Sequence, residues 1–142
     1  MFSKEESRQL RHEFWTSFGK SFPKKWILYN TKIKGFSFKF HFDTKTALVS
    51  LDVEGDLESR INYWEKLIAL KQILLNDYLP NAIFDEVYIL DNGKEISRIY
   101  VKLNSQVSIH NKNSWQETMT FFNDTMRLFE SFFKDYEDFI KA

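Results

Sequence analysis

The chain has 142 residues, no cysteine, and twenty basic and twenty acidic residues, so its formal net charge is zero. This length suits one domain with a hydrophobic core, and we expect a single domain over residues 1–142. The composition excludes disulfides and thiolate metal sites. Apolar runs are short and the N-terminus is charged, so neither a membrane span nor a signal peptide is expected, and the predicted location is cytoplasmic.

The first predicted element is an amphipathic helix over about residues 4–19. Ser3 and Glu6 have the spacing of a capping box, in which each side chain accepts from the other residue's backbone N–H. Phe14 and Phe18 are four residues apart and therefore lie on one face of the helix. We expect this face to be buried.

Residues 24–33, KKWILYNTKI, are rich in aromatic and β-branched residues. This composition predicts a first strand. Lys34 and Gly35 would then turn the chain into the next strand. Together with the two strands that follow, it would form a meander of three antiparallel strands.

Residues 36–53 predict a β-hairpin with one apolar and one polar face. Two sets of apolar residues occur at every second position: Phe36, Phe38, Phe40, Phe42 and Ala47, Val49, Leu51, Val53. A two-residue loop at 44–45 or a four-residue loop over 43–46 would place Phe42 opposite Ala47 and Phe36 opposite Val53, so that apolar residues meet across the pair. The other face holds mostly polar residues, expected to face solvent: Ser37, Lys39, His41, Ser50, Asp52, with Leu48 as the exception. One buried face is typical of an antiparallel sheet that helices cover on one side.

A second helix is predicted to begin after Asp56, a suitable N-cap, and to continue to Tyr78, close to the helix-breaking Pro80. Its apolar residues keep helical spacing throughout. No break is expected within it.

Asn92-Gly93 predicts a second hairpin, because a type I′ turn requires positive φ at both central residues. The flanking strands would be residues 83–90 and 95–103. The first of these is apolar on both faces, so the pattern leaves open which face is buried.

The last predicted element is a long helix over about residues 114–140. Ser114 and Glu117 again have capping-box spacing, and the apolar residues that follow form a wide stripe. We expect this stripe to pack on the sheet, while a surplus of aromatic residues leaves a homodimer interface as an alternative. The predicted fold class is therefore α+β, an antiparallel sheet of about five strands with helices packed on it, in the order α-β-β-β-α-β-β-α.

Charge is distributed unevenly along the chain. Residues 1–45 carry ten basic and four acidic residues, whereas residues 46–142 carry ten and sixteen. Basic residues alternate with aromatic ones in the first part of the chain: Lys20, Lys24, Lys25, Trp26, Tyr29, Lys32, Lys34, Lys39. Such a surface can bind phosphates and stack bases, so nucleic acid or an acidic protein is the predicted partner. The alternative is an edge strand whose lysines prevent pairing with other sheets.

Asp52 and Glu54 alternate on one predicted strand and therefore share a face. With Lys39 across the hairpin they could hold Mg²⁺ for phosphodiester hydrolysis. Restriction-type nucleases carry a lysine two residues after the second acid, but Asp56 occupies that position here. The three histidines show no metal-ligand spacing, and the chain lacks a glycine-rich phosphate loop. No cofactor, metal ligand or catalytic residue is therefore predicted.

Four segments carry a family likeness: EFWTSF (13–18), ALVSLDVE (47–54), SRIYV (97–101) and the aromatic helix that begins at Trp115. They resemble an uncharacterised bacterial domain family that occurs alone in short proteins and also fused behind predicted restriction-type endonuclease modules. The resemblance implies an accessory module near nucleic-acid metabolism or defence, and it supplies no catalytic residues. Arg98, in the SRIYV segment, matches the family pattern, either as a ligand-facing charge or as a cross-strand ion-pair partner.

The sequence thus favours a non-catalytic binding or accessory module. The predicted binding residues are Lys24, Lys25, Trp26, Lys34, Lys39 and Arg98. A small metal-dependent hydrolase and a homo-oligomeric structural module are the alternatives, so whether the chain is an enzyme is left open.

Overall fold

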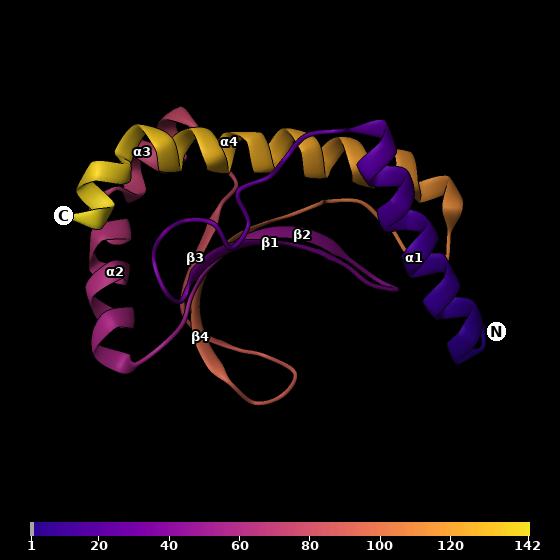
Figure 1. The fold of residues 1–142 in the computed structure, drawn as a ribbon, viewed down its shortest axis with the longest axis horizontal. Coiled ribbons are helices and arrows are strands. Elements are labelled where there is room, and N and C mark those ends of the chain that lie inside the picture. The colour runs from indigo at the N-terminus through magenta and orange to yellow at the C-terminus, as the bar shows by residue number, and fades with distance from the viewer. Residues whose placement is uncertain (1) are drawn as a thin grey trace.

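The hairpin predicted over residues 36–53 is present in the computed structural model, which describes residues 2–142 (Figure 1). Strand β1 (Phe36–Phe42) pairs with β2 (Ala47–Val53) in the predicted register, with Phe36 opposite Val53 and Phe42 opposite Ala47. In the turn, the Asp43 carboxylate accepts hydrogen bonds from the backbone N–H groups of Lys45 (2.8 Å) and Thr46 (2.7 Å). Apolar side chains on one face and this turn together fix the register.

The second predicted hairpin is also confirmed. Strands β3 (Ile83–Ile89) and β4 (Glu95–Lys102) flank a turn in which Gly93 has φ 85°. Asn92 does not have positive φ, so the predicted type I′ geometry of this turn is wrong. The sheet is antiparallel and has the order β1-β2-β4-β3, so β4 lies beside β2 and β3 is an outer strand. The face left open by the sequence is now assigned: Phe84 of β3 pairs with the buried Ile99 of β4, on the face that the helices cover.

The strand predicted over residues 24–33 is wrong, and the sheet has four strands rather than about five. Leu28 (φ 48°) and Lys32 (φ 67°) adopt left-handed backbone, which an extended strand does not allow. Residues 22–35, which we call the connecting segment, instead meet the edge of β1 through a hydrogen bond from the Phe38 N–H to the Leu28 carbonyl (3.0 Å). The aromatic and β-branched composition of this segment serves packing, not a ladder of hydrogen bonds.

Gly35 closes the connecting segment at a position that only glycine fits. Its φ is 76°, and a Cβ placed there would lie 2.7 Å from the Glu54 carbonyl oxygen. The Glu54 N–H donates to the Gly35 carbonyl at 2.6 Å, so the two backbones approach closely where β1 begins and β2 ends. The turn that the sequence predicted at this glycine is thus real, although the strand before it is not.

Helix α1 (Lys4–Ser21) begins with the predicted capping box between Ser3 and Glu6. The second predicted helix begins at its predicted cap, Asp56, but is interrupted at Leu70 into α2 (Leu57–Ala69) and α3 (Lys71–Asp77). Leu70 has φ −95° and ψ 1°, outside the helical region. The apolar spacing continues through this residue, so it gave no sign of the break.

Helix α4 (Trp115–Lys141) runs along one face of the sheet, as predicted (Figure 1). Its buried phenylalanines meet those of β1, with ring centroids 6.0 Å apart for Phe129 and Phe38 and 5.0 Å apart for Phe122 and Phe40. The capping box predicted at Ser114 is wrong, because a short 3₁₀ turn precedes the helix and the Ser114 hydroxyl bonds to the Asn111 carbonyl (2.7 Å). No helix described in residues 2–142 is long and apolar enough to cross a membrane.

The sheet curves, and in the described part of the chain its concave face carries no helix (Figure 1). We call this the open face. It holds the alternate residues of β1, β2 and β4 that point away from α4.

Candidate functional site

The open face is polar, as predicted, but much of it is buried rather than facing solvent. Ser50 and Asp52 of β2 are fully buried, and Arg98 of β4 is 3% exposed. The expectation that this face would be wet is therefore wrong at its centre. Longer side chains at the rim of the open face exclude water from these three residues.

Asp52 and Arg98 form the centre of the open face. They are opposite each other in the β2–β4 register, and Arg98 donates from Nε (2.7 Å) and Nη2 (2.8 Å) to the two carboxylate oxygens. Burial lowers the pKa of Arg98, but its hydrogen bonds to Asp52 and the charge of that carboxylate outweigh burial, so the net pKa is raised. Of the two roles that the sequence left open for Arg98, the structure shows the cross-strand ion pair. A two-pronged pair of this kind fixes the geometry of both side chains.

Lys39, Glu54 and Lys94 extend this pair toward the edge of the sheet. Lys39 Nζ lies 3.4 Å from Asp52 Oδ2 and 3.2 Å from Glu54 Oε2, and Lys94 Nζ lies 2.6 Å from Glu54 Oε1. Burial raises the pKa of Glu54, but the hydrogen bonds from Lys94 and Lys39 lower it more, so its pKa lies below the ordinary value. With Arg98 the network has three cations and two carboxylates, which leaves one positive charge in excess.

This geometry does not favour a metal ion between Asp52 and Glu54. Both carboxylates already accept from cations, and an arriving Mg²⁺ would have to displace Arg98, Lys39 or both. Within residues 2–142, no group of three or more histidines, aspartates or glutamates is arranged to hold a metal ion.

His41 and Ser50 are the other polar pair on this face. His41 Nε2 lies 3.0 Å from Ser50 Oγ, the separation that a nucleophile and its base require. Burial first, and then the Arg98 charge, lower the pKa of His41 to about 4, so the ring is neutral at pH 7. Ser50 has no exposed surface. A substrate therefore cannot reach its hydroxyl, and the pair connects β1 to β2 instead.

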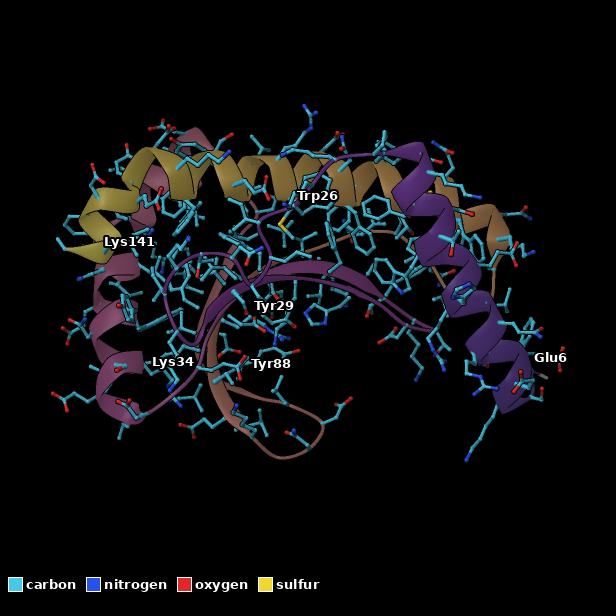
Figure 2. The ribbon with its side chains drawn as sticks, viewed as in Figure 1. Glu6, Trp26, Tyr29, Lys34, Tyr88 and Lys141 are labelled. Carbon is cyan, nitrogen blue, oxygen red and sulfur yellow. The ribbon has the colours of Figure 1, made fainter. Side chains whose placement is uncertain are left out.

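Tyrosines cover the ionic network from the solvent side. The Tyr88 ring lies 4.3 Å from Arg98 Cζ, and the Tyr29 ring lies 6.0 Å from Lys39 Nζ. Figure 2 shows both tyrosines on the side of the sheet away from α4. Tyr29 is 71% exposed, whereas Tyr88 lines a hollow of about 220 Å³ that has Arg98 on its wall. Aromatic rings over cations make a surface that can stack on a flat ligand.

The structure does not bring the six predicted binding residues together. Lys39 and Arg98 lie on the open face, whereas Trp26 packs on the covered side, with its ring 5.6 Å from that of Phe40. Lys24 lies over the Trp26 ring (4.6 Å) and pairs with the buried Glu130 of α4 (2.7 Å). The other two predicted residues, Lys25 and Lys34, are exposed.

Two residues of the open face escaped the sequence analysis. Tyr88 and Lys94 belong to the second hairpin, whose place in the sheet no local pattern revealed. The pairing of β4 with β2 brings them to the network, and the only signal was that Arg98 and Asp52 become same-face partners once that pairing is assumed. Finding these residues would have required the register between β2 and β4, whose paired residues Asp52 and Arg98 are 46 positions apart in the sequence.

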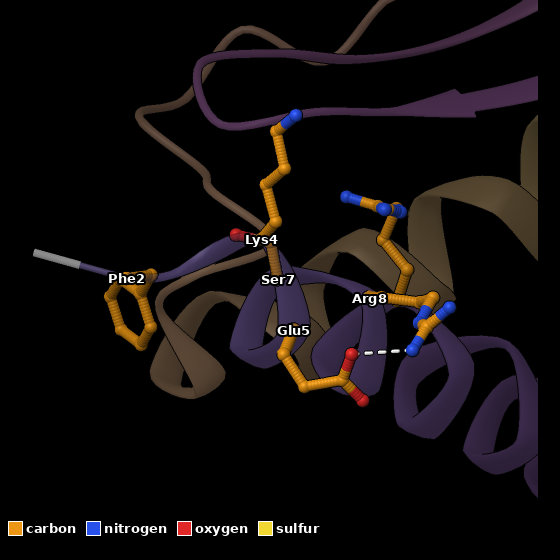
Figure 3. Close-up of a pocket in the computed structure, with 6 residues that line it drawn as sticks. Phe2, Lys4, Glu5, Ser7 and Arg8 are labelled. Carbon is orange, nitrogen blue, oxygen red and sulfur yellow. Dashed lines mark hydrogen bonds and ion pairs between the residues drawn. The ribbon is translucent and has the colours of Figure 1, made fainter.

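A larger hollow, of about 600 Å³, lies beside the N-terminus of α1 (Figure 3). It is lined by Phe2, Lys4, Glu5 and Arg8, among others, and is formed by exposed side chains. Arg8 pairs with Glu5, and the capping box already satisfies N–H groups at the helix start. These side chains are solvated rather than assembled, so this hollow is the weaker candidate.

The fold and this site define an α+β domain in which helices cover one face of an antiparallel sheet and an ionic network occupies the other. Residues 10–137 match the model of a family described as a domain of unknown function (DUF4268), and the chain belongs to this family. The predicted resemblance to an uncharacterised domain family is thereby confirmed, while the link to endonuclease modules stays a prediction. No curated protein and no solved structure matches the chain.

Proposed function

We propose that this chain is a non-catalytic binding module that holds single-stranded nucleic acid on the open face of its sheet. The observation that carries the proposal is the exposed ring of Tyr29 above Lys39, at the rim of a network with one positive charge in excess. We call Tyr29, Lys34, Lys39 and Lys94 the tyrosine–lysine surface. The proposal moves the binding surface from the predicted N-terminal edge to the open face.

Phosphate groups are the ligand chemistry that these lysines favour. Lys94 is 52% exposed while it contacts Glu54, and Lys34 is exposed on the same side of the sheet (Figure 2). Lys39 is held by two carboxylates, which position its ammonium group under the Tyr29 ring. Contacts between such cations and phosphates release counterions, so binding should weaken as salt rises.

A single strand fits this surface better than a duplex does. The face of an unpaired base can stack on a tyrosine ring, whereas in a duplex the base faces are hidden in the stack. Tyr29 offers its ring to solvent at the tip of the connecting segment, and Tyr88 lies on the same open face (Figure 2). The link of this family to restriction-type endonuclease modules, which stays a prediction, agrees with this ligand class.

The non-catalytic part of the proposal rests on the state of the polar groups. Asp52 and Glu54 are engaged by cations, the lowered pKa of His41, about 4, makes its ring a weak base, and the Ser50 hydroxyl is buried. None of these groups is left as an available base, nucleophile or metal ligand. The open face is thus equipped to hold a ligand and not to cleave it.

The test is fluorescence anisotropy with a labelled oligothymidylate of about 12 nucleotides, within the usual site size for such surfaces. Binding should be weaker at moderate than at low salt. Tyr29→Ala should weaken it about tenfold through lost stacking. Lys34→Glu/Lys94→Glu should reduce the slope of log K against log salt by about 1.4, since each phosphate contact contributes about 0.7. Lys134→Glu, an exposed lysine of α4, is the matched control and should change neither quantity.

Several results would reject the proposal. Binding that is absent, or insensitive to salt, removes the ligand class. Equal losses in Lys134→Glu and Lys34→Glu/Lys94→Glu would mean that the protein binds by its overall charge. A Lys25→Glu variant separates the two surfaces, because a larger loss there would place the ligand on the predicted N-terminal edge. Tighter binding to an acidic peptide than to the oligonucleotide would favour an acidic protein partner.

A further inference from the structure

A second surface of the protein is apolar and lies on the outer strand of the sheet and the helix beside it. Ten large apolar side chains of residues 2–142 are exposed, and six of them belong to α2 and β3: Leu57, Ile61, Ile68, Ile83, Val87 and Ile89. Of these, Ile83 pairs with Tyr100 and points to the open face, so it is not part of this surface. Val87 is 51% exposed and Leu57 is 62% exposed. Exposed apolar side chains that gather on two adjacent elements are typical of an interaction site.

The two elements enclose a groove of about 210 Å³. Leu57 and Ile61 of α2 form one wall, Val87 of β3 forms the other, and the buried Trp64 lies between them. Arg60, which also lines the groove, is paired with Glu95, and Glu86 lines it from β3. Val87 lies within the irregularity that interrupts the β3–β4 pairing between Asp85 and Tyr88. The groove is therefore continuous with the edge of the strand and has the dimensions of one or two side chains.

The outer edge of β3 is also available for hydrogen bonding. In the sheet order β1-β2-β4-β3, β3 is terminal, and the backbone bonds described for residues 83–89 all go to β4 or to the Ser97 side chain. The opposite terminal strand, β1, is instead contacted by the connecting segment, through the Leu28 carbonyl. Apart from the Glu86 carbonyl, which accepts from the Ser97 hydroxyl within the β3–β4 irregularity, this edge offers its backbone groups to a further strand.

Charge decides which strand would be accepted. Glu86 is the central residue of β3 and Asp85 precedes it, and Glu58 stands at the start of α2. If β3 paired with β3 of a second copy in antiparallel fashion about its centre, Glu86 of one copy would face Glu86 of the other, which is unfavourable. We propose that the edge of β3 and the α2 groove dock an extended segment of another protein, whose apolar side chains enter the groove on one face and whose basic side chains meet Asp85 on the other face.

The probe is a synthetic peptide of alternating lysine and valine, seven residues long and blocked at both ends, titrated into ¹⁵N-labelled full-length protein. Backbone amide shifts should change in a saturable way at Ile83–Ile89, Leu57 and Ile61. Asp85→Lys and Ile61→Glu should each weaken the affinity by about tenfold, equivalent to about 1.4 kcal/mol. Leu128→Glu replaces an equally exposed residue of α4 and should leave the affinity unchanged.

Four results would overturn the inference: no shifts at β3, equal affinity for a peptide of alternating glutamate and valine, unchanged affinity in Ile61→Glu, or a dimer by light scattering that Val87→Glu dissociates. The last would show a second copy as the occupant. Because Tyr29 lies over Lys39 of β1, at the opposite edge of the sheet from β3, Tyr29→Ala should not affect the peptide titration. Failure of nucleic-acid binding and failure of this docking surface are thus measured independently.

Discussion

The two faces of the sheet are buried to a similar degree by different kinds of interaction. On the α4 side, Phe38 and Leu51 are fully buried among aromatic and aliphatic side chains. On the open side, Asp52 is equally buried and Arg98 nearly so, but they are covered by single side chains such as Tyr88. Apolar burial stabilises a fold in proportion to area, whereas a buried ion pair about breaks even against its own desolvation. The comparison teaches that stability comes mainly from one face, which leaves the other free to be shaped for a ligand.

The largest expected effect is on the covered face. Phe38→Ala should lower the free energy of unfolding by about 4 kcal/mol, because it removes a ring surrounded by other rings and leaves a cavity. The Phe38 ring lies 5.6 Å from that of Phe133 and 6.0 Å from that of Phe129. Urea denaturation followed by tryptophan fluorescence measures the change. A loss below about 1.5 kcal/mol would mean that this face is not the main source of stability.

The next effect distinguishes the chemistry of the open face. Asp52→Ala should cost about 3 kcal/mol, because it leaves Arg98 buried without its partner. Replacing both residues, in Asp52→Leu/Arg98→Leu, should recover most of that loss, since an apolar pair needs no compensating charge. The same denaturation experiment compares the single and double variants. A double variant no more stable than Asp52→Ala would show that the ion pair is itself a main source of stability.

The covered face was largely predictable from the sequence, because its signals are local. Alternation of period two fixed the β1–β2 register, and Asn92-Gly93 fixed the second hairpin. The caps at Ser3 and Asp56 located the starts of two helices. In each case neighbouring residues in the chain decide the outcome.

The capping box at Ser114 failed for a local reason, the 3₁₀ turn that precedes α4, but the failed strand and the unexpected burial on the open face depend on residues far apart in the chain. The connecting segment is held by Glu130, whose carboxylate accepts from the Ile27 N–H at 2.6 Å, a contact between residues 103 positions apart. Burial of Asp52 likewise depends on β4 and on Tyr88 of β3. Strand propensity is a local property and does not report such distant contacts. It therefore could not predict that residues 24–33 form no strand, or that Asp52 is buried. The polar residues that β1 and β2 contribute to the candidate site were therefore predictable, but the residues that the second hairpin contributes, Tyr88 and Lys94, were not.

The smallest of the three effects uses pH to isolate one group on the open face. The ring of His41 is faced by Arg98, Lys39, Asp52 and Asp43, and burial is the largest cause of its lowered pKa, about 4 against 6.5 in an unfolded chain. Above pH 6.5 the ring is neutral in both states, so its contribution to stability is complete. As the pH falls below 6.5, His41 is protonated in the unfolded chain but stays neutral in the folded protein. The free energy of unfolding therefore declines until about pH 4.

The loss should reach about 1 kcal/mol one pH unit below the ordinary pKa of histidine. The lowered pKa of Glu54 acts in the same direction, but only below its ordinary value of 4.5, so the range from pH 6.5 to 4.5 reports on His41. Urea denaturation at a series of pH values should show a shallower decline for His41→Gln, while His12→Gln, a change at an exposed histidine of α1, should follow the parent protein. If the free energy of unfolding depends on pH in the same way for His41→Gln and the parent, then water reaches His41 on the open face. In that case the two faces of the sheet would differ in their burial as well as in their chemistry.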